Sequence, residues 1–278
     1  MYQVKFYPLE RVEDYLERLP TFRTEDVVVR CTINTERQKC KVVKGFKAVV
    51  RDDTEDVVAI VSSRYKLAQH RTVFKIFIEK LRQFYGDANL KGYVTHEGTR
   101  AFLFVTCKEI ELKDDSVYDM GFMVTNSVDA TMGIRVALFQ YRLVCSNGLI
   151  SKENIMEMYQ KHVQGQMSDF WKKLKQKYEA VISKFDTYVD DTVKKLQIMK
   201  ETVVKAWELI DKIDWLSDSA KKLLKTKVKK EDTLFNVYQA LTWYFSNYPI
   251  SRMTFNGRIE RLQNATKVIE QAIPVKAR

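Results

Sequence analysis

Residues 101–112 read AFLFVTCKEIEL, residues 118–125 read YDMGFMVT, and residues 134–145 read IRVALFQYRLVC. All three stretches are rich in β-branched and aromatic residues, which favour strands. In the third stretch Ile134, Val136 and Leu138 alternate with Ala137 and Phe139, so both faces of this strand are apolar. We therefore predict neighbouring strands of an antiparallel sheet in which this strand is covered on both faces.

The rest of the first half continues the pattern. Turn residues at His96–Thr99 and Lys113–Ser116 predict hairpin loops. Apolar residues at helical spacing predict a helix over Thr72–Tyr85 that covers the sheet: Val73, Phe74, Phe77, Ile78, Leu81 and Phe84. The predicted strands are Val27–Glu36, Cys40–Arg51, Val57–Val61, Lys91–Thr95, Ala101–Leu112, Tyr118–Thr125 and Ile134–Cys145.

The second half favours helix. Between Gly165 and Pro249 the sequence contains neither glycine nor proline, and apolar residues recur at spacings of three and four. An unbroken helix over 167–210 would be roughly 70 Å long at 1.5 Å per residue, so it needs a partner along its length. It either folds back on Ala220–Lys230 and Leu234–Phe245 as a helical hairpin or pairs with another subunit as a coiled coil.

The predicted fold class is therefore α+β: an antiparallel sheet with a covering helix, followed by a long helical region. A length of 278 residues suits one large domain or two small ones, and we place the division at 1–150 and 151–278. Hydrophobic residues make up 45% of the chain and charged residues 30%, with only 4 Pro and 9 Gly. This composition excludes a disordered, collagen-like or disulfide-scaffold protein.

The chain is basic, with 47 Lys+Arg against 36 Asp+Glu and a formal net charge of +11. Residues 1–150 hold 23 basic and 20 acidic residues, and residues 151–278 hold 24 and 16, so the second half carries most of the excess. An anionic partner such as nucleic acid or a membrane surface explains this balance. The Lys/Glu-rich surface of a thermophilic protein is the alternative.

Several classes of protein lack support. No GxGxxG, GxxxxGK[ST], HExxH or GxSxG motif occurs, which argues against dinucleotide, P-loop, zincin and α/β-hydrolase chemistry. The three histidines lie far apart in sequence, so we expect no metal ion and no cofactor. The cysteines match no paired zinc pattern, and we predict that they are reduced core residues: Cys31, Cys40, Cys107 and Cys145.

The sequence also argues against a membrane protein. No window approaches the roughly 18 uncharged apolar residues that a membrane span requires, and the first residues lack the apolar core of a signal peptide. We predict a cytoplasmic protein with no membrane partner.

Three polar clusters interrupt the apolar strands. Ser62–Lys66 precedes the helix start at Arg71, where basic residues beside a tyrosine can hold phosphate while the ring stacks on a base; a capped loop is the alternative. Thr125–Thr131 suits a tight turn between strands, and Arg142–Leu149 carries a strand into a Ser-Asn-Gly turn. The predicted nucleic-acid-binding residues are Arg64, Tyr65, Lys66, Arg71, Asn126, Asp129, Arg142 and Asn147.

Two lysine runs, Lys172–Lys177 and Lys221–Lys230, are either solvated helix faces or phosphate contacts.

These clusters, together with the segment Asp232–Ala240, resemble the phage- and plasmid-like proteins of the domain of unknown function 932 family. The similarity covers roughly residues 25–270, and Arg142–Leu149 is its most specific part. Where the family pattern reads Asn-Ser-His-Asp-Gly-Ser, this chain has Val128 and Ala130 in place of the His and the Gly, so a catalytic role for that histidine is not carried over. The resemblance implies a mobile-element or viral origin and no established activity.

The order of helix, hairpins and helix also resembles the fold of phage-type single-strand annealing proteins, although fold does not fix function. We therefore predict a non-enzymatic protein that binds single-stranded nucleic acid, with DNA favoured, as an annealing or recombination mediator that forms homo-oligomers through its long helices. One alternative is an enzyme of unrecognised type that uses Asn126, Asp129, Arg142 and Asn147. Another is a helical scaffold that binds a protein partner.

Overall fold

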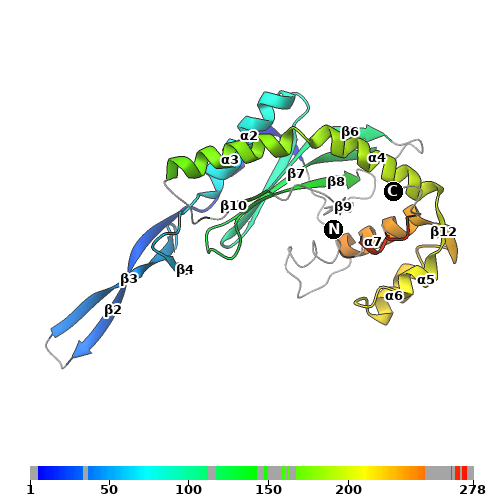
Figure 1. The fold of residues 1–278 in the computed structure, drawn as a ribbon. Helices are drawn as coiled ribbons and strands as arrows, with labels where there is room; N and C mark the ends of the chain where they lie inside the picture. Colours follow the sequence, from blue (N-terminus) through cyan, green and yellow to red (C-terminus); the bar gives the residue numbers. More distant parts are fainter. Residues whose placement is uncertain are drawn as a thin grey trace.

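A seven-stranded antiparallel sheet forms the centre of the molecule (Figure 1). The computed structural model describes residues 6–33, 37–111, 117–142, 147–149, 158–160, 162, 167–247, 264, 267–269 and 271–273. The strands lie in the order β1-β5-β6-β7-β8-β10, and β9 also pairs with β8.

The strands are β1 (Tyr7–Pro8), β2 (Phe22–Ile33), β3 (Arg37–Arg51), β4 (Val57–Ser62), β5 (Lys91–Glu97), β6 (Arg100–Glu111), β7 (Val117–Ser127), β8 (Ile134–Arg142), β9 (Asn147–Leu149), β10 (Met158–Gln160), β11 (Val203–Lys205) and β12 (Glu231–Thr233). The helices are α1 (Leu9–Leu16), α2 (His70–Tyr85), α3 (Met167–Ile182), α4 (Phe185–Glu201), α5 (Ala206–Asp211), α6 (Asp218–Lys225) and α7 (Leu234–Asn247).

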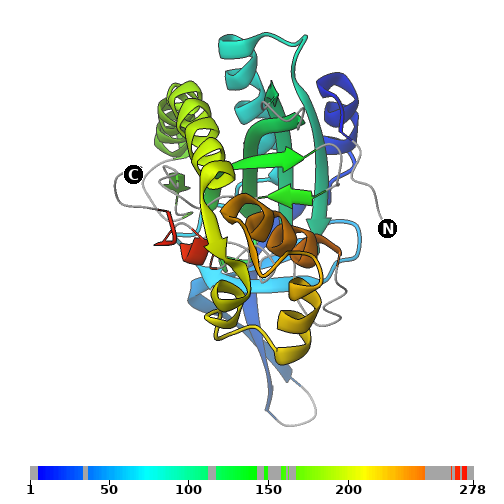
Figure 2. The same ribbon diagram turned by 90° about the vertical axis from the view of Figure 1, so that its right-hand side faces the viewer.

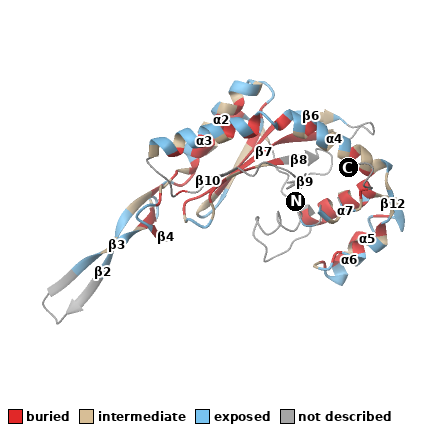
Figure 3. Cartoon of the chain, in the orientation of Figure 1, coloured by how far each residue is buried: buried red, intermediate tan, exposed pale blue. Residues whose placement is uncertain are grey.

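Helices α2 and α3 cover one face of the central sheet, and both turn buried residues toward it (Figure 3). The ring of Phe77 on α2 lies 4.9 Å from that of Tyr178 on α3 and 5.5 Å from that of Phe122 on β7, measured between centroids. Phe102 and Phe104 alternate with the residues of β6 that face the helices, and they form a small cluster on the opposite face. The predicted covering helix is confirmed, except that Phe84 is 46% exposed.

All seven predicted strands are present, with ends that shift by a few residues. The loop predicted at 96–99 is a tight turn in which Gly98 takes φ = +58°, a conformation that glycine adopts without strain. The loop predicted at 113–116 and the end of the strand predicted to reach Cys145 lie outside the described residues. The prediction of a single sheet is wrong, because β2, β3 and β4 form a separate three-stranded antiparallel sheet.

This second sheet carries a long hairpin that projects away from the rest of the molecule (Figure 1). Pairing of β2 with β3 shifts register between Asp26 and Val28 and then continues to Ile33 and Arg37. Strand β4 accompanies β3 only between Phe46 and Val50, so the outer part of the hairpin has two strands. We call residues 27–47 the arm.

The C-terminal region is helical, as predicted, but its first helix is interrupted. A turn at Ser183 and Lys184 separates α3 from α4. Thr202, Val203 and Val204 are β-branched residues, and the last two lie in β11, which pairs with β12. Helix α7 then packs back against α4, which is the fold-back arrangement expected for a hairpin, although it involves shorter helices.

The hydrophobic residues divide between two cores. One core unites the central sheet with α1, α2, α3 and the start of α4, as far as Val189. The other begins at Leu196 and gathers α5, α6 and α7 against Tyr118 of β7. The predicted boundary at residue 150 precedes α3, whose buried residues belong to the first core.

The cysteines differ in their surroundings. Cys107 is buried in the first core, as predicted. Cys40 is exposed on the arm, so its prediction as a core residue is wrong. The side chains of Cys31 and Cys145 lie outside the described residues.

Among the described helices, none has the length and apolar character needed to cross a bilayer.

Candidate nucleic-acid interface

Three of the predicted site residues come together where the connection from β4 to α2 meets the end of β7. Tyr65, Asn126 and Asp129 lie here, joined by two histidines, His70 and His162. We call Tyr65, His70, Asn126 and His162 the polar junction.

Tyr65 is enclosed by this junction. Its side chain is 7% exposed, and its hydroxyl donates to the carbonyl of Ser127 over 3.4 Å. Its ring lies 5.2 Å from the ring of His162, between centroids. Next to it, Lys66 exchanges hydrogen bonds with the same histidine: its backbone N–H donates to the His162 carbonyl over 2.6 Å, and its carbonyl faces His162 Nδ1 at 3.1 Å. In this conformation the Tyr65 ring is not open to a base.

Asn126 and His70 form the buried centre of the junction. The Asn126 amide nitrogen donates to the Ala68 carbonyl over 2.9 Å and lies 3.0 Å from His70 Nδ1. Both side chains are fully buried. Within the described part of the chain, His70 Nε2, His162 Nε2 and Asn126 Oδ1 have no hydrogen-bond partner.

Burial sets the charge of the two histidines. It lowers the pKa of His70 to about 3, and the neighbouring His96 and His162 act in the same direction. Burial also lowers the pKa of His162, despite the opposing hydrogen bond at the Lys66 carbonyl. Both imidazoles are therefore neutral near pH 7.

Asp129 occupies a turn that fixes the end of β7. Burial raises the pKa of this carboxyl, but hydrogen bonds from Thr131 and Thr99 outweigh that effect and hold the pKa below its usual value. The adjacent Ala130 takes φ = +60°, which is why glycine suits this position of the family pattern. Val128 is fully buried against Phe22. An Asp129 carboxylate that stays ionised is suited to accept hydrogen bonds that hold the turn. A general acid would instead need a raised pKa.

The remaining predicted residues are dispersed. Arg64 is exposed in the turn after β4. Arg71 forms an ion pair with Glu17 of the loop after α1, so its guanidinium already has an anionic partner. Arg142 and Asn147 are opposite one another in the pairing of β8 with β9, and their side chains lie outside the described residues.

Sequence analysis missed the two histidines. His70 continues the apolar face of α2, since it precedes Val73 and Phe74 by three and four positions, and this spacing was an available signal. For His162 the sequence carries no comparable pattern, because its contact with Tyr65 depends on the tertiary fold.

Helices α5, α6 and α7 lie at the end of the molecule opposite the arm (Figures 1 and 2), and a second set of polar contacts is found on them and on the loop between α6 and α7. The ammonium groups of Lys225 and Lys230 lie 5.8 and 5.3 Å from the ring centroid of Trp207. The Lys227 ammonium lies 4.1 Å from the ring centroid of Trp243. We call these five residues the lysine–tryptophan surface. Both indoles are partly exposed, and Lys227 and Lys230 are exposed.

The indole of Trp207 and the loop before α7 are held in place by hydrogen bonds. Trp207 Nε1 donates to the Val228 carbonyl over 3.4 Å. Asp232 accepts from the backbone N–H of Lys229 over 2.9 Å and from the Asn236 amide over 2.6 Å. Asp232 and Asn236 belong to the segment Asp232–Ala240 that resembles the family, so this segment holds the backbone at Lys229.

The positive charge of the chain is concentrated in two segments. Residues 221–230 contain six lysines and no acidic residue, a net charge of +6. The arm contains six basic residues and one acidic residue, a net charge of +5. Together they account for the whole formal excess of +11, and the rest of the chain is balanced.

Among the described residues, no three His, Cys, Asp or Glu side chains gather into a group that could hold a metal ion.

Comparison with known proteins identifies one family. The model described as "Domain of unknown function (DUF932)" matches residues 57–266, from β4 to beyond α7. The match begins after the arm. No curated protein and no solved structure matches the chain.

Proposed function

The chain belongs to the DUF932 family, and we propose that it binds single-stranded nucleic acid, with DNA favoured, through the lysine–tryptophan surface. The observation that carries this proposal is the placement of three lysine ammonium groups within 6 Å of two partly exposed indoles. Bases of a single strand stack on aromatic rings, while cationic side chains follow the backbone.

The lysines suit phosphate contact because most of them are not neutralised. Lys225 is paired with Asp211 over 2.7 Å, which leaves it fixed beside Trp207. Lys227, Lys229 and Lys230 are exposed, residues 221–230 contain no acidic side chain, and Glu231 and Asp232 are the acidic residues that follow them. A strand that stacks on the indoles would therefore meet uncompensated positive charge.

The polar junction has a different part in this proposal. Tyr65 and Asn126 fix the chain between β4 and α2, and Arg64 and Lys66 supply positive charge at the surface beside it. We propose that Arg64 and Lys66 form a secondary contact for phosphate. Arg71 contributes less to it, because its guanidinium is already paired with Glu17. The alternative of an enzyme at Asn126 and Asp129 is less favoured, because Asn126 is fully buried and the Asp129 carboxylate is held by hydrogen bonds from Thr99 and Thr131.

The broader biological role follows from the same activity. A protein that binds single strands and self-associates is suited to anneal strands during recombination of a mobile element, and we propose that role here. Self-association through α3 and α4 is the remaining prediction, and light scattering with and without a bound oligonucleotide measures it.

The test is a fluorescence anisotropy titration with a labelled single-stranded oligonucleotide at two or more salt concentrations. We expect Lys227→Gln/Lys230→Gln to weaken binding and to reduce the slope of log K against log salt by about 1.4, since each phosphate contact on a single strand contributes about 0.7. The control is Lys172→Gln/Lys175→Gln, which removes the same charge from exposed positions of α3. Equal slopes for both variants and the unaltered protein would remove the proposal.

A further inference from the structure

The arm has no covering layer along most of its length. Beyond the register shift, six residue pairs join β2 to β3, from Val28 opposite Val42 to Ile33 opposite Arg37. At about 3.4 Å per residue this two-stranded part is roughly 20 Å long. It points away from the central sheet and from the C-terminal helices (Figure 1). An extension of this kind is accessible to a partner on both faces.

Apolar side chains of the arm are open to solvent. Val28, Val29 and Val42 are each 49% exposed, and Phe46 is 50% exposed. All four lie on the two long strands, close to where the third strand ends. Exposed apolar groups that gather on a projecting β-hairpin are typical of a contact surface.

The net positive charge of the arm favours an anionic partner. Lys41, Lys44 and Lys47 have no acidic side chain within ion-pair distance among the described residues. These three lysines all lie on β3, so basic side chains recur along the described part of the arm. A second copy of the arm would carry the same net charge of +5 and would be repelled.

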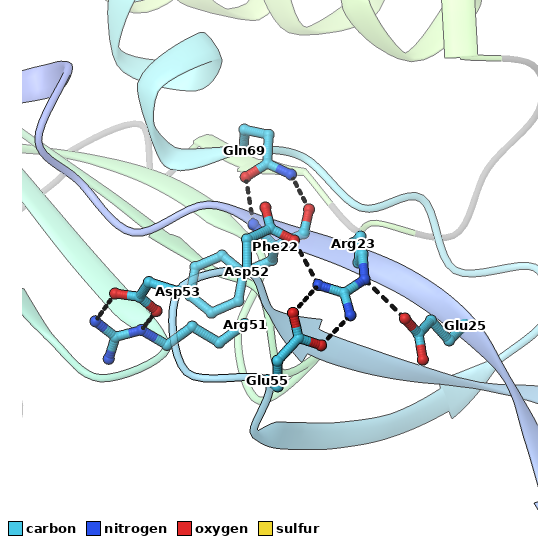
Figure 4. Close-up of polar contacts among 8 residues, drawn as sticks. All are labelled: Phe22, Arg23, Glu25, Arg51, Asp52, Asp53, Glu55 and Gln69. Carbon is cyan, nitrogen blue, oxygen red and sulfur yellow. Dashed lines mark hydrogen bonds and ion pairs between the residues drawn. The ribbon is translucent and has the colours of Figure 1, made fainter.

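At the root of the arm, where residues 22–26 of β2 pair with residues 47–51 of β3, four carboxylates are held by two arginines (Figure 4). Arg23 pairs with Glu25 over 2.7 Å, with Asp52 over 3.2 Å and also with Glu55. Arg51 pairs with Asp53 over 2.6 Å. These four carboxylates are thus tied to Arg23 and Arg51, and Asp26, opposite Lys47, is the acidic residue that lies beside the basic residues of the arm.

The root also fixes the direction of the arm. Gln69, which precedes α2, accepts from the backbone N–H of Phe22 over 3.2 Å and donates to the carbonyl of the same residue. The side chain of Phe22 is buried against Val49, Val61 and Tyr65. The arm therefore leaves the body from an anchored strand.

We propose that the arm is a second nucleic-acid site, which inserts into the major groove of double-stranded DNA. The major groove is about 12 Å wide and admits a two-stranded β-ribbon, whose strands lie about 4.8 Å apart. Lysines of the arm would contact phosphates at the groove walls, and its valines suit the methyl groups of thymine. This site lies outside the segment that matches the family and does not depend on the single-strand site.

The affinity for duplex RNA can be compared with the affinity for duplex DNA to test groove insertion. The major groove of A-form RNA is deep and narrow, and side chains do not reach its bases. A β-ribbon that works by entering the groove should therefore bind duplex DNA more tightly than duplex RNA of the same sequence, although both carry the same phosphate charge.

The experiment is an anisotropy titration of the full chain with duplex DNA and duplex RNA of one sequence. We expect Lys41→Gln/Lys44→Gln to weaken binding to duplex DNA at least tenfold and to reduce its salt slope by about 1.8. The charge-matched control Lys172→Gln/Lys175→Gln should lower affinity less than twofold. Unchanged duplex DNA affinity in the arm variant, or equal affinity of the unaltered protein for the two duplexes, would overturn the proposal.

A second measurement requires no variant. Cys40 is exposed on the arm, so its alkylation by a maleimide reports access to the arm, and peptide mass spectrometry distinguishes it from the other cysteines. We expect saturating duplex DNA to slow alkylation of Cys40 at least fivefold. Unchanged alkylation at saturation would contradict groove insertion, as would protection that appears with rising protein concentration in the absence of DNA, since that result would assign the arm to a second copy.

Discussion

The arm and residues 221–230, which supply the lysines of the lysine–tryptophan surface, carry nearly equal positive charge, +5 and +6, on very different frameworks. The arm is a ribbon whose outer part has two strands, with half-exposed valines and Phe46 between its basic residues. The lysine–tryptophan surface rests on three short helices that share a buried core, and its lysines lie against indoles. Similar positive charge is therefore presented once on a narrow two-stranded extension and once beside two partly exposed indoles.

This difference shows why net charge alone does not define a nucleic-acid-binding site. Phosphate attracts any concentration of lysine, but the framework determines which form of nucleic acid fits. A ribbon can enter a groove and offers few rings for stacking, whereas fixed indoles suit unpaired bases. This difference is the reason for proposing duplex DNA as the ligand of the arm and single strands as the ligand of the helices.

The largest effect is expected from removing one ring of the lysine–tryptophan surface. Trp243→Leu keeps an apolar side chain beside the second core but removes the stacking face. Because base–aromatic stacking is worth about 1–3 kcal/mol per base, single-strand affinity should fall roughly 5- to 150-fold while duplex affinity changes little. Anisotropy measures both, with Trp171→Leu on α3 as the control. A loss that is equal for single strands and duplex would contradict the separation of the two sites.

The next effect concerns pH and the polar junction, which lies on the arm's side of the molecule. The folded-state pKa of His70 is about 3, below its ordinary value of 6.5, so the unfolded chain binds the proton first. This histidine therefore contributes stability above pH 6.5 that is lost as pH falls toward 3, by at most about 1.4 kcal/mol per pH unit. His162, whose pKa is also lowered, acts in the same sense.

Urea unfolding between pH 7 and 4.5 measures this dependence. We expect His70→Gln to have a shallower decline in the free energy of unfolding than the unaltered protein. His96→Gln, at an exposed histidine of β5, removes only one of the smaller contributions to the lowered pKa of His70 and should therefore change the decline less than His70→Gln does. The interpretation fails if His70→Gln and the unaltered protein lose stability in parallel.

A smaller effect is expected at the root of the arm. Gln69→Ala removes two hydrogen bonds to the backbone of Phe22 and should cost about 1–2 kcal/mol of folding stability. It should also weaken duplex binding severalfold, because the direction of the arm is less fixed, and leave single-strand binding unchanged. Gln83→Ala, on the exposed part of α2, is the control. A decrease in single-strand affinity instead would show that the two regions are coupled.

The smallest effect is expected at the turn after β7. Ala130→Gly relieves the left-handed conformation at φ = +60° and should stabilise the protein by roughly 0.5–1 kcal/mol, with no change in either affinity. Ala137→Gly, in the regular strand β8, should destabilise by a similar amount. Thermal unfolding checks both. A lower melting temperature for Ala130→Gly would show that this alanine makes contacts that outweigh the backbone strain.

The sequence predicts local elements of this fold well and their assembly less well. Alternating apolar residues locate β8, and spacings of three and four locate α2, because both patterns are properties of neighbouring positions. The separation of β2, β3 and β4 into their own sheet depends on pairing between distant residues, which no local pattern reports. The break after Glu201 lies where β11 pairs with β12, which is again a contact between residues that are distant in sequence.

The same reasoning explains the outcome for the candidate site. The sequence placed Tyr65, Asn126 and Asp129 in one site, and the fold brings them together. It did not show that the Tyr65 ring is covered by His162, which approaches from a distant segment. The lysine run at 221–230 was visible as charge, but its meaning depends on Trp207 and Trp243, which only the tertiary fold brings to it.

The most direct test of two separate sites is hydrogen exchange of the unaltered protein, measured by mass spectrometry with a saturating single-stranded oligonucleotide and then with duplex DNA. The account predicts that the single strand slows amide exchange in residues 206–211 and 225–247 and leaves residues 28–47 unchanged, and that the duplex slows exchange in residues 28–47. Protection of the same segment by both ligands, or of neither segment by either ligand, would contradict it.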